Sequence, residues 1–374
     1  MFELLGNFWT SLFAFLLVLT VLVFVHEMGH YWAARQCSVR VETFSVGFGP
    51  EIFGKTSVSG TRWKLSAIPF GGYVKMYGEK PPGQGDDKEG YSHLNLEQSF
   101  FNKPLWQRAW IVFAGPLANL LFAILVLAVL FISIGEPHTP ANIARVGEGT
   151  AAERAGLRAG DIFLKIDDHD IKSFEDVRRI VQSVPGRNIR ITVNREGSLI
   201  ELTAVPETVR EERFGSIHVF GRLGVSRGNG DTAFVKHNPF SAFYKATAQT
   251  GTMAVGMLKA IKEIILGQRT PQELGGPIKI AQMSGEMAQA GFIVLAQFVV
   301  ILSINLGIIN LLPVPLLDGG HLTFYLLEAL RGKPVGDRAM GVCLNIGFFL
   351  LIMLTVFVTW NDLLQTSIGK LFKE

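Results

Sequence analysis

The sequence predicts a polytopic α-helical membrane protein with four transmembrane helices. A small α+β domain is inserted between the second and third of them, and a β-hairpin lies in the first loop. Of the 374 residues, 48% are hydrophobic and only 18% are charged, against about 25% charged in soluble domains. Four apolar segments also approach the roughly 20 residues that cross a bilayer as a helix. These features exclude a disordered chain, a coiled coil and an ordinary cytosolic enzyme.

The four apolar segments are Phe8–Val25, Ala109–Ile134, Phe292–Leu312 and Asn345–Trp360, with Gly341–Leu344 extending the last. The first has 18 uncharged residues, which span about 27 Å as a helix. The ten residues at the N-terminus carry Glu3 and no Lys or Arg, and no small-residue cleavage site follows the apolar run. We therefore expect this segment to be a retained helix and not a cleaved signal peptide.

The distribution of basic residues predicts the orientation in the membrane. Residues 31–108 carry ten Lys and Arg, and the short loop after the third span carries Arg331, Lys333 and Arg338. By the positive-inside rule both loops are cytoplasmic, which places both termini and the long insert 135–290 on the opposite side.

These segments divide the chain. The predicted regions are 1–35 (first transmembrane helix), 36–108 (cytoplasmic loop with the β-hairpin), 109–135 (second helix), 141–207 (inserted domain), 208–290 (amphipathic region), 291–330 (third helix and the turn after it) and 341–367 (fourth helix). Within the amphipathic region, the four charged residues of Pro239–Leu266 favour an interfacial helix over a fifth span, and the choice stays open.

The inserted domain shows strand and helix patterns. Asn188–Val193 and Leu199–Ala204 alternate apolar and polar residues around a short turn, which predicts a hairpin. Ser173 and Asp176 have the spacing of a capping box at the start of a helix. The segment Ala155–Asp161 precedes a predicted strand and resembles the A-G-L-x-x-G-D signature of bacterial PDZ domains.

The first transmembrane segment continues directly into His26-Glu27-Met28-Gly29-His30. Residues i and i+4 share a helix face, so both imidazoles can bind one metal ion, and Glu27 can accept a proton from water on that ion. Zinc is the expected metal, because it binds neutral imidazoles and activates water. Three ionisable side chains at membrane depth are costly, which favours a functional role over a structural one.

A catalytic zinc takes three protein ligands, so a third is required. Asp86 and His93 belong to a polar cytoplasmic loop, and the histidines of the outer insert fall across the bilayer: His138, His169, His218 and His237. Asp318 and His321 follow the third span on the expected side. A carboxylate from Asp318 would complete the set, with His321 as the less favoured ligand and a helix N-cap as the alternative role of Asp318.

With these motifs the chain resembles the site-2 protease family of intramembrane zinc metalloproteases, of the regulator-of-sigma-E (RseP) type. Matching segments include Asn310–Gly319, Gly47–Pro50, Pro69–Val74 and Ala114–Asn119. The resemblance implies that zinc binds to His26, His30 and Asp318, that Glu27 is the catalytic acid/base, and that Asn310 and Pro313 shape the site near the substrate. Well-known members carry two tandem PDZ domains, whereas this insert has room for one.

Two further patterns have competing interpretations. Trp63–Met76 predicts a hairpin that turns at Gly71-Gly72, which is either an ordinary cytoplasmic hairpin or a membrane-associated one whose edge binds an unwound substrate by β-augmentation. The resemblance favours the second, with Gly71, Gly72, Tyr73 and Val74 as substrate-binding residues. In the second span, Gly115, Asn119 and Ala123 form a small-residue stripe that is typical of close helix packing.

The sequence therefore predicts an intramembrane zinc endopeptidase of the bacterial inner membrane. Its substrates would be transmembrane segments of single-pass proteins, either anti-sigma-factor-like proteins or signal-peptide remnants, and the PDZ groove would bind a peptide C-terminus. The alternatives are a non-catalytic PDZ scaffold, a membrane-anchored zincin acting on soluble peptides, and a zinc transporter. A net charge of +3 without a basic cluster argues against nucleic acid as a partner. Cys37 and Cys343 are expected to be inert thiols.

Overall fold

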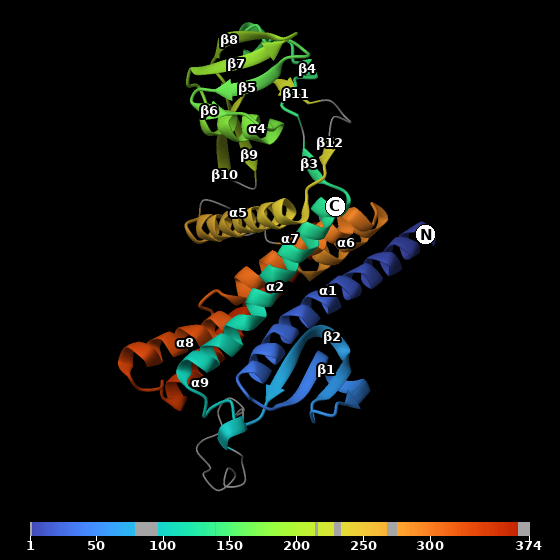
Figure 1. The fold of residues 1–374 in the computed structure, drawn as a ribbon, viewed down its shortest axis with the longest axis vertical. Helices are drawn as coiled ribbons and strands as arrows, with labels where there is room; N and C mark the ends of the chain where they lie inside the picture. The colour runs from blue at the N-terminus through green and yellow to red at the C-terminus, as the bar shows by residue number, and fades with distance from the viewer. Residues whose placement is uncertain are drawn as a thin grey trace. The chain divides into compact units, whose positions relative to one another are not determined.

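The computed structural model describes residues 2–78, 96–138, 140–213, 216–227, 233–267 and 275–365 (Figure 1). It divides into two compact units. We call the first the helical unit, which comprises Met1–Ala128, Phe243–Lys262 and Pro271–Glu374. The second is the inserted unit, which comprises Val129–Ala242 and Glu263–Thr270.

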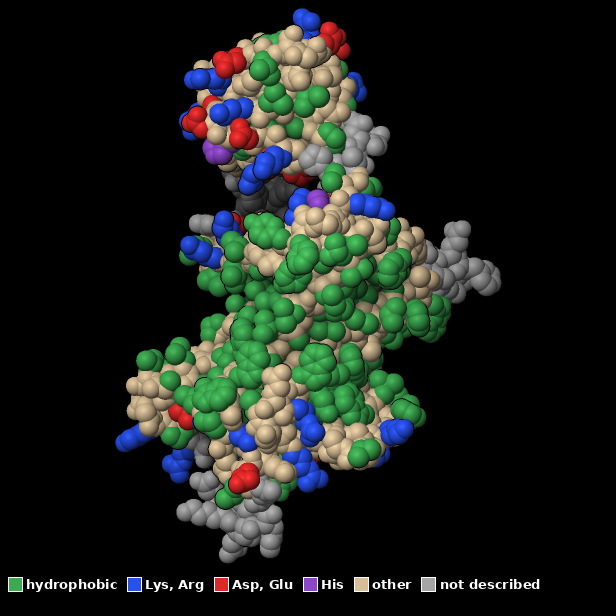
Figure 2. Space-filling view, viewed as in Figure 1, with side chains coloured by type: hydrophobic (Ala, Val, Ile, Leu, Met, Phe, Trp, Pro, Cys, Tyr) green, Lys and Arg blue, Asp and Glu red, His purple; other side chains and the backbone are tan. Residues whose placement is uncertain are grey.

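The main helices are α1 (Phe2–Gln36), α2 (Leu105–Ser133), α5 (Pro239–Ile265), α6 (Pro277–Gln289), α7 (Phe292–Asn310), α8 (Asp318–Arg331) and α9 (Asp337–Gln365). Among the described residues, four segments are long and apolar enough to cross a membrane: Trp9–Gln36, Leu105–Ser133, Phe292–Asn310 and Arg338–Leu363. They overlap the four predicted spans, and the first and last are longer than predicted. Helix α5 is not among them, and its interfacial position stays a prediction. Figure 2 shows hydrophobic side chains gathered over the long helices, as lipid contact requires.

Small residues let the helices of this unit approach closely. A Cβ at Gly29 of α1 would overlap the carbonyl oxygen of Ala114 on α2, and one at Gly285 of α6 would overlap the Ser11 side chain. On α7, a Cβ at Gly307 would lie 3.1 Å from the Pro116 oxygen. Helices in lipid gain most of their association energy from such close packing.

The β-hairpin is longer than predicted and turns elsewhere. Strand β1 (Val41–Thr56) and strand β2 (Arg62–Met76) are antiparallel and joined at residues 57–61. The prediction of a turn at Gly71-Gly72 is therefore wrong, because β2 continues through both glycines. Gly71 has φ +94°, and the register shifts along this stretch, so the glycines bend the strand without reversing it.

An aromatic cluster attaches the hairpin to α1. Phe44 is fully buried and pairs with both Trp63 and Val74, because the hairpin curls over itself. Its ring stacks on Trp63 with centroids 4.5 Å apart and meets the edges of Phe24 and Tyr31 of α1. These ring contacts hold β1 and the start of β2 against α1.

In the inserted unit a four-stranded sheet has the order β6 (His169–Asp170), β5 (Ile162–Ile166), β7 (Ile189–Arg195) and β8 (Ser198–Ala204). Short helices α3 (Ala151–Arg154) and α4 (Phe174–Ser183) accompany it. Two-stranded pairs complete the unit: β3 (Glu136–His138) with β12 (Ala233–Val235), β4 (Arg145–Val146) with β11 (Val225–Ser226), and β9 (Glu207–Arg213) with β10 (Ser216–Arg222). The predicted hairpin and the capping box of Ser173 and Asp176 are both confirmed.

The last residue of the A-G-L-x-x-G-D segment forms a buried ion pair. Asp161 has no exposed surface, and Arg195 donates to it from Nε at 2.7 Å and from Nη2 at 2.8 Å. The Arg158 backbone amide donates to the same carboxylate at 2.8 Å, and Arg195 also donates to the Gly156 carbonyl. Burial alone would raise the pKa of Asp161, but these hydrogen bonds hold it below its ordinary value.

We predict that Asp161→Asn weakens the inserted unit, because a neutral amide leaves the Arg195 guanidinium without its counter-charge. The carboxylate's contribution to the free energy of unfolding should be complete above the ordinary carboxyl pKa of about 4. It should be lost as the pH falls through the lower folded-state value. Hydrogen exchange of β5 and β7 amides in the full chain measures both effects. Equal exchange rates in parent and variant at neutral pH would contradict the prediction.

Candidate metal centre and active site

Helix α1 places His26, Glu27 and His30 inside the helical unit. Their exposed fractions are 9%, 8% and 8%. The two histidines lie one turn apart, as the i, i+4 spacing predicts, with ring centroids 4.8 Å apart. Their Nε2 atoms point to one place and are separated by 3.2 Å.

Asp318, the first residue of α8, reaches the same place from the other end of the chain. A tight turn precedes it, in which Leu316 has the positive φ of +79° that non-glycine residues seldom adopt. A Cβ at Gly319 would overlap the carbonyl oxygens of Leu311 and Leu312, and one at Gly320 would overlap that of Val314. The two glycines therefore let the first turn of α8 pack directly on this turn, which fixes the position of Asp318.

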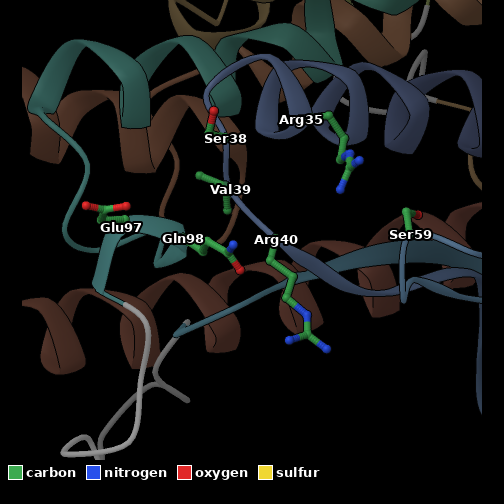
Figure 3. A pocket seen from close by; sticks show the side chains of 7 residues that line it. All are labelled: Arg35, Ser38, Val39, Arg40, Ser59, Glu97 and Gln98. Carbon is green, nitrogen blue, oxygen red and sulfur yellow. The ribbon is translucent and has the colours of Figure 1, made fainter.

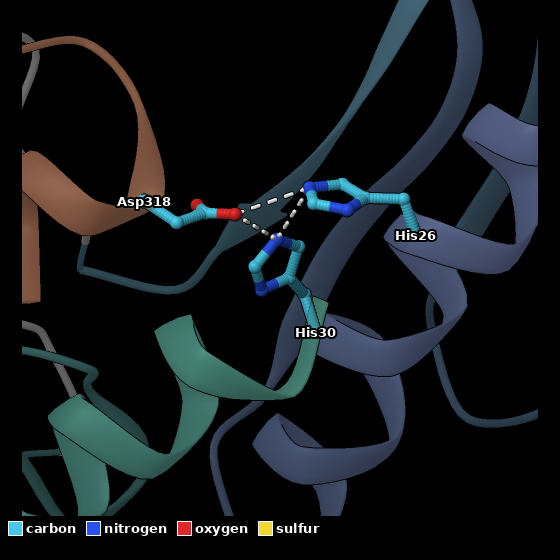
Figure 4. Close-up of side chains that lie close together, drawn as sticks. All are labelled: His26, His30 and Asp318. Carbon is cyan, nitrogen blue, oxygen red and sulfur yellow. Dashed lines mark hydrogen bonds and ion pairs between the residues drawn. The ribbon is translucent and has the colours of Figure 1, made fainter. Parts of the chain in front are cut away.

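Three potential ligand atoms converge here (Figure 4). Asp318 Oδ2 lies 3.2 Å from His26 Nε2 and 3.5 Å from His30 Nε2. Ligands about 2.0–2.2 Å from a tetrahedral zinc are separated by roughly 3.3–3.6 Å. Oδ2 is also buried without a hydrogen-bond partner among the described residues. Both the spacing and this orphaned oxygen fit a zinc ion held by two histidines and a carboxylate.

Each histidine has a second contact that bears on its orientation. His30 Nδ1 lies 2.9 Å from the Ile111 carbonyl oxygen and donates to it, which leaves the Nε2 lone pair for a metal. His26 Nδ1 lies 3.0 Å from the side-chain nitrogen of Asn119. Both contacts come from α2, so this helix supports both imidazoles.

Glu27 lies beside the ligand atoms and against the hairpin. A Cβ at Gly72 of β2 would lie 3.0 Å from Glu27 Cγ and 2.8 Å from Val23 Cγ1. Strand β2 therefore passes next to the carboxylate that the sequence identifies as the acid/base, and only a glycine leaves room for it.

The remaining predicted residues have different positions. His321 is half-buried, one turn after Asp318, and is not part of the convergent group. Asn310 ends α7, and Pro313 lies exposed in the turn to α8. Asp86 and His93 lie outside the described residues.

Two residues of the small-residue stripe have a closer relation to the site than the packing interpretation predicts. A Cβ at Gly115 would overlap His30 Nε2, so this glycine makes space for a ligand ring. Asn119, one turn later, contacts the other histidine. In the sequence, the polar side chain of Asn119 within an uncharged transmembrane segment could have indicated this role. Ala123 is fully buried, as close packing requires.

Two cavities of the helical unit do not contain the convergent residues. One of about 510 Å³ lies beyond the C-terminal end of α1 and is lined by Arg35, Ser38, Val39, Arg40, Ser59, Glu97 and Gln98 (Figure 3). Another of about 540 Å³ is an apolar groove between α1 and α2, lined by Met28, Gly29 and their neighbours. His26, Glu27, His30 and Asp318 line neither of them.

We predict that Gly115→Ala lowers zinc affinity by about 10–100-fold, the usual effect of displacing a ligand's support, because the new methyl group pushes the His30 ring aside. Gly256→Ala on α5 is the matched control, since a Cβ there meets nothing within 4 Å. Chelator competition on the purified proteins measures both affinities. Parental affinity in Gly115→Ala would mean that the His30 ring can bind zinc from another position.

Comparison with known proteins agrees with this geometry. Peptidase family M50 matches residues 14–354. A protein of Agrobacterium fabrum named "Putative zinc metalloprotease" is 43% identical over 355 residues, which cover 93% of this chain and 94% of that protein. Metalloprotease MmpA of Caulobacter vibrioides is 35% identical over 393 residues, covering 97% and 98% of the two chains. Among solved structures, the PDZ domain of an SdrC-like protein from Listeria monocytogenes is similar at 16% identity and a TM-score of 0.20, covering 25% of this chain and 93% of that one. The chain belongs to peptidase family M50, the zinc-dependent metalloproteases of the site-2 protease type.

Proposed function

We propose that this metalloprotease is an intramembrane endopeptidase that cuts transmembrane segments of single-pass membrane proteins. The observation that carries the proposal is the convergence of Asp318 of α8 with His26 and His30. These histidines and Glu27 lie on α1, a helix long and apolar enough to span a bilayer. A membrane-anchored zincin acting on soluble peptides would place these groups in a water-exposed domain. Here the three α1 residues are at most 9% exposed.

Each residue has a distinct role in peptide hydrolysis. His26, His30 and Asp318 would hold the zinc ion, which would supply a Lewis acid that polarises the scissile carbonyl and lowers the pKa of the attacking water. Glu27 takes a proton from the attacking water and passes it to the departing amine. Contacts from α2 and the packing of the first turn of α8 keep these side chains in place.

A helical substrate must unwind locally, because its peptide bonds are hydrogen-bonded and sterically covered. Strand β2 is the proposed platform for the unwound segment, since Gly72 lies so near Glu27 that an added Cβ would be 3.0 Å from Glu27 Cγ. Among the residues that the structure describes, Tyr73 and Val74 have register partners in β1 only. An extended peptide added to this strand would pass close to the acid/base.

The hairpin also carries apolar side chains on its surface. The most exposed of them are Phe48, Ile52, Phe53, Val58, Leu65 and Ile68. Exposed apolar groups in this number are unfavourable in water and suit a surface that contacts lipid or a membrane-embedded substrate. This supports the proposal that the hairpin is membrane-associated.

The proposed orientation follows the basic loops. The ten Lys and Arg of residues 31–108 favour a cytoplasmic position for the hairpin and the catalytic side, with both termini and the inserted unit in the periplasm. The inserted unit acts as a PDZ domain that restricts access to the site and binds a peptide C-terminus. Anti-sigma-factor-like proteins and signal-peptide remnants are the proposed substrates.

We predict that Glu27→Gln retains zinc and the fold but lowers cleavage about 10²–10⁴-fold, because an amide cannot accept the proton. Cleavage of a single-span substrate in proteoliposomes, together with bound zinc measured by mass spectrometry, tests this. Turnover near the parental rate in the variant would rule out Glu27 as the acid/base.

Removing a ligand should have a different signature. We predict that His26→Ala, His30→Ala and Asp318→Ala each lose zinc as well as activity, because a catalytic zinc site requires three protein ligands. His321→Ala is the matched control and should retain zinc. If Asp318→Ala is fully loaded and His321→Ala is empty, His321 is the third ligand.

The role of β2 can be tested with two adjacent prolines. Successive residues of an antiparallel strand direct their N–H groups to opposite edges, so Tyr73→Pro and Val74→Pro remove donors from opposite edges. We predict that the proline on the β1 side destabilises the hairpin. The proline variant that removes the N–H on the edge of β2 away from β1 should keep its zinc and its thermal stability but cleave more slowly. A stable proline variant that cuts at the parental rate would remove β2 from substrate binding.

A further inference from the structure

We propose that Asn119 is a positioning residue for His26: its side-chain amide accepts a hydrogen bond from Nδ1–H and so directs Nε2 toward the metal. This inference rests on the proposed zinc site. It assigns a role to a residue of α2 that supplies no ligand atom of its own.

Burial and contact geometry single out this side chain. Asn119 is 0% exposed, and its side-chain nitrogen lies 3.0 Å from His26 Nδ1. Its side-chain oxygen is also buried and has no hydrogen-bond partner among the described residues. A buried amide oxygen without a donor costs free energy, so a proton donor is expected next to it.

The chemistry of a metal-bound imidazole supplies that donor. When Nε2 binds a metal, the proton of the neutral ring resides on Nδ1, which then requires an acceptor. A half-turn of the Asn119 amide about its Cβ–Cγ bond exchanges the nitrogen and oxygen at nearly the same positions. The oxygen then receives the Nδ1–H group, which pairs the orphaned acceptor and fixes the His26 tautomer.

The backbone of Asn119 is itself held in place. Ser303 of α7 is fully buried and donates its hydroxyl to the Asn119 carbonyl oxygen at 2.8 Å. The two histidines therefore differ in their support. His30 donates to the backbone carbonyl of Ile111, and a substitution of Ile111 would leave that carbonyl in place. The partner of His26 is the side chain of Asn119, which a substitution can remove.

This difference makes the role testable. Removing an outer partner of a metal-binding histidine lowers metal affinity about 10–100-fold. We expect that loss in Asn119→Leu, which keeps the size of the side chain but offers no acceptor. Asn119→Asp offers an acceptor and should restore zinc affinity to within a few-fold of the parent. Ser284→Ala on α6 is the control for a lost buried hydrogen bond, since Ser284 is 0% exposed and donates to the Ile280 carbonyl away from the site, and it should bind zinc as the parent does.

The experiment uses the full chain in detergent and measures zinc affinity by chelator competition and the visible absorption of the Co²⁺-substituted protein. In Asn119→Leu we expect weaker zinc binding and a changed Co²⁺ spectrum, with recovery of both in Asn119→Asp. Thermal unfolding identifies misfolded variants, and Asn119→Ala replaces Asn119→Leu if the larger side chain is not tolerated.

Two outcomes would overturn the inference: parental affinity and Co²⁺ spectrum in the Leu and Ala variants, or equal losses in the Asp and Leu variants. His26→Ala separates this failure from that of the zinc site. If His26→Ala loses zinc while Asn119→Leu does not, only the role of Asn119 is wrong. If His26→Ala retains parental affinity, the proposed site itself is wrong.

Discussion

The arrangement of the candidate site depends on how closely α1 and α2 approach each other. Gly29 lies against the Ala114 carbonyl, and Gly115 lies against the His30 ring, so a side chain at either position would separate the helices. At this separation the Ile111 carbonyl reaches His30 and the Asn119 amide reaches His26. In lipid no hydrophobic effect drives helices together, so packing of this kind must supply the association energy. The contact that holds the two helices thus also orients the two imidazoles.

Burial of ionisable groups is the second constraint on this region. His26, Glu27, His30 and Asp318 come together in a largely buried part of the helical unit, where a charge without a partner is costly. A divalent cation shared by the proposed ligands, two imidazoles and a carboxylate, would offset that cost. Bringing the Asp318 carboxylate to this point requires a strained backbone at Leu316. It also requires glycines at positions 319 and 320, where a side chain would overlap the preceding turn.

Local patterns in the sequence predict those parts of the molecule that local geometry decides. The i, i+4 spacing of His26 and His30 gives a shared helix face, and the Ser173–Asp176 spacing gives a cap. The proximity of Asp318 follows from counting spans and sides of the membrane. Non-local contacts are different. The Gly71-Gly72 pair permits either a turn or a bent strand, and only pairing with β1 decides between them. Asn119 fits a packing stripe equally well until its distance to His26 is known.

The ligand set comes from opposite ends of the chain. His26 and His30 belong to the first helix, whereas Asp318 begins the helix before the last one. A ribosome synthesises the chain from its N-terminus, and elements fold as they emerge. With the proposed ligands, a growing polypeptide would carry two of its three metal contacts through most of translation. The third would be added only after the inserted unit and α7 have been made. The complete zinc site, and with it proteolytic activity, would therefore form only when synthesis is nearly complete.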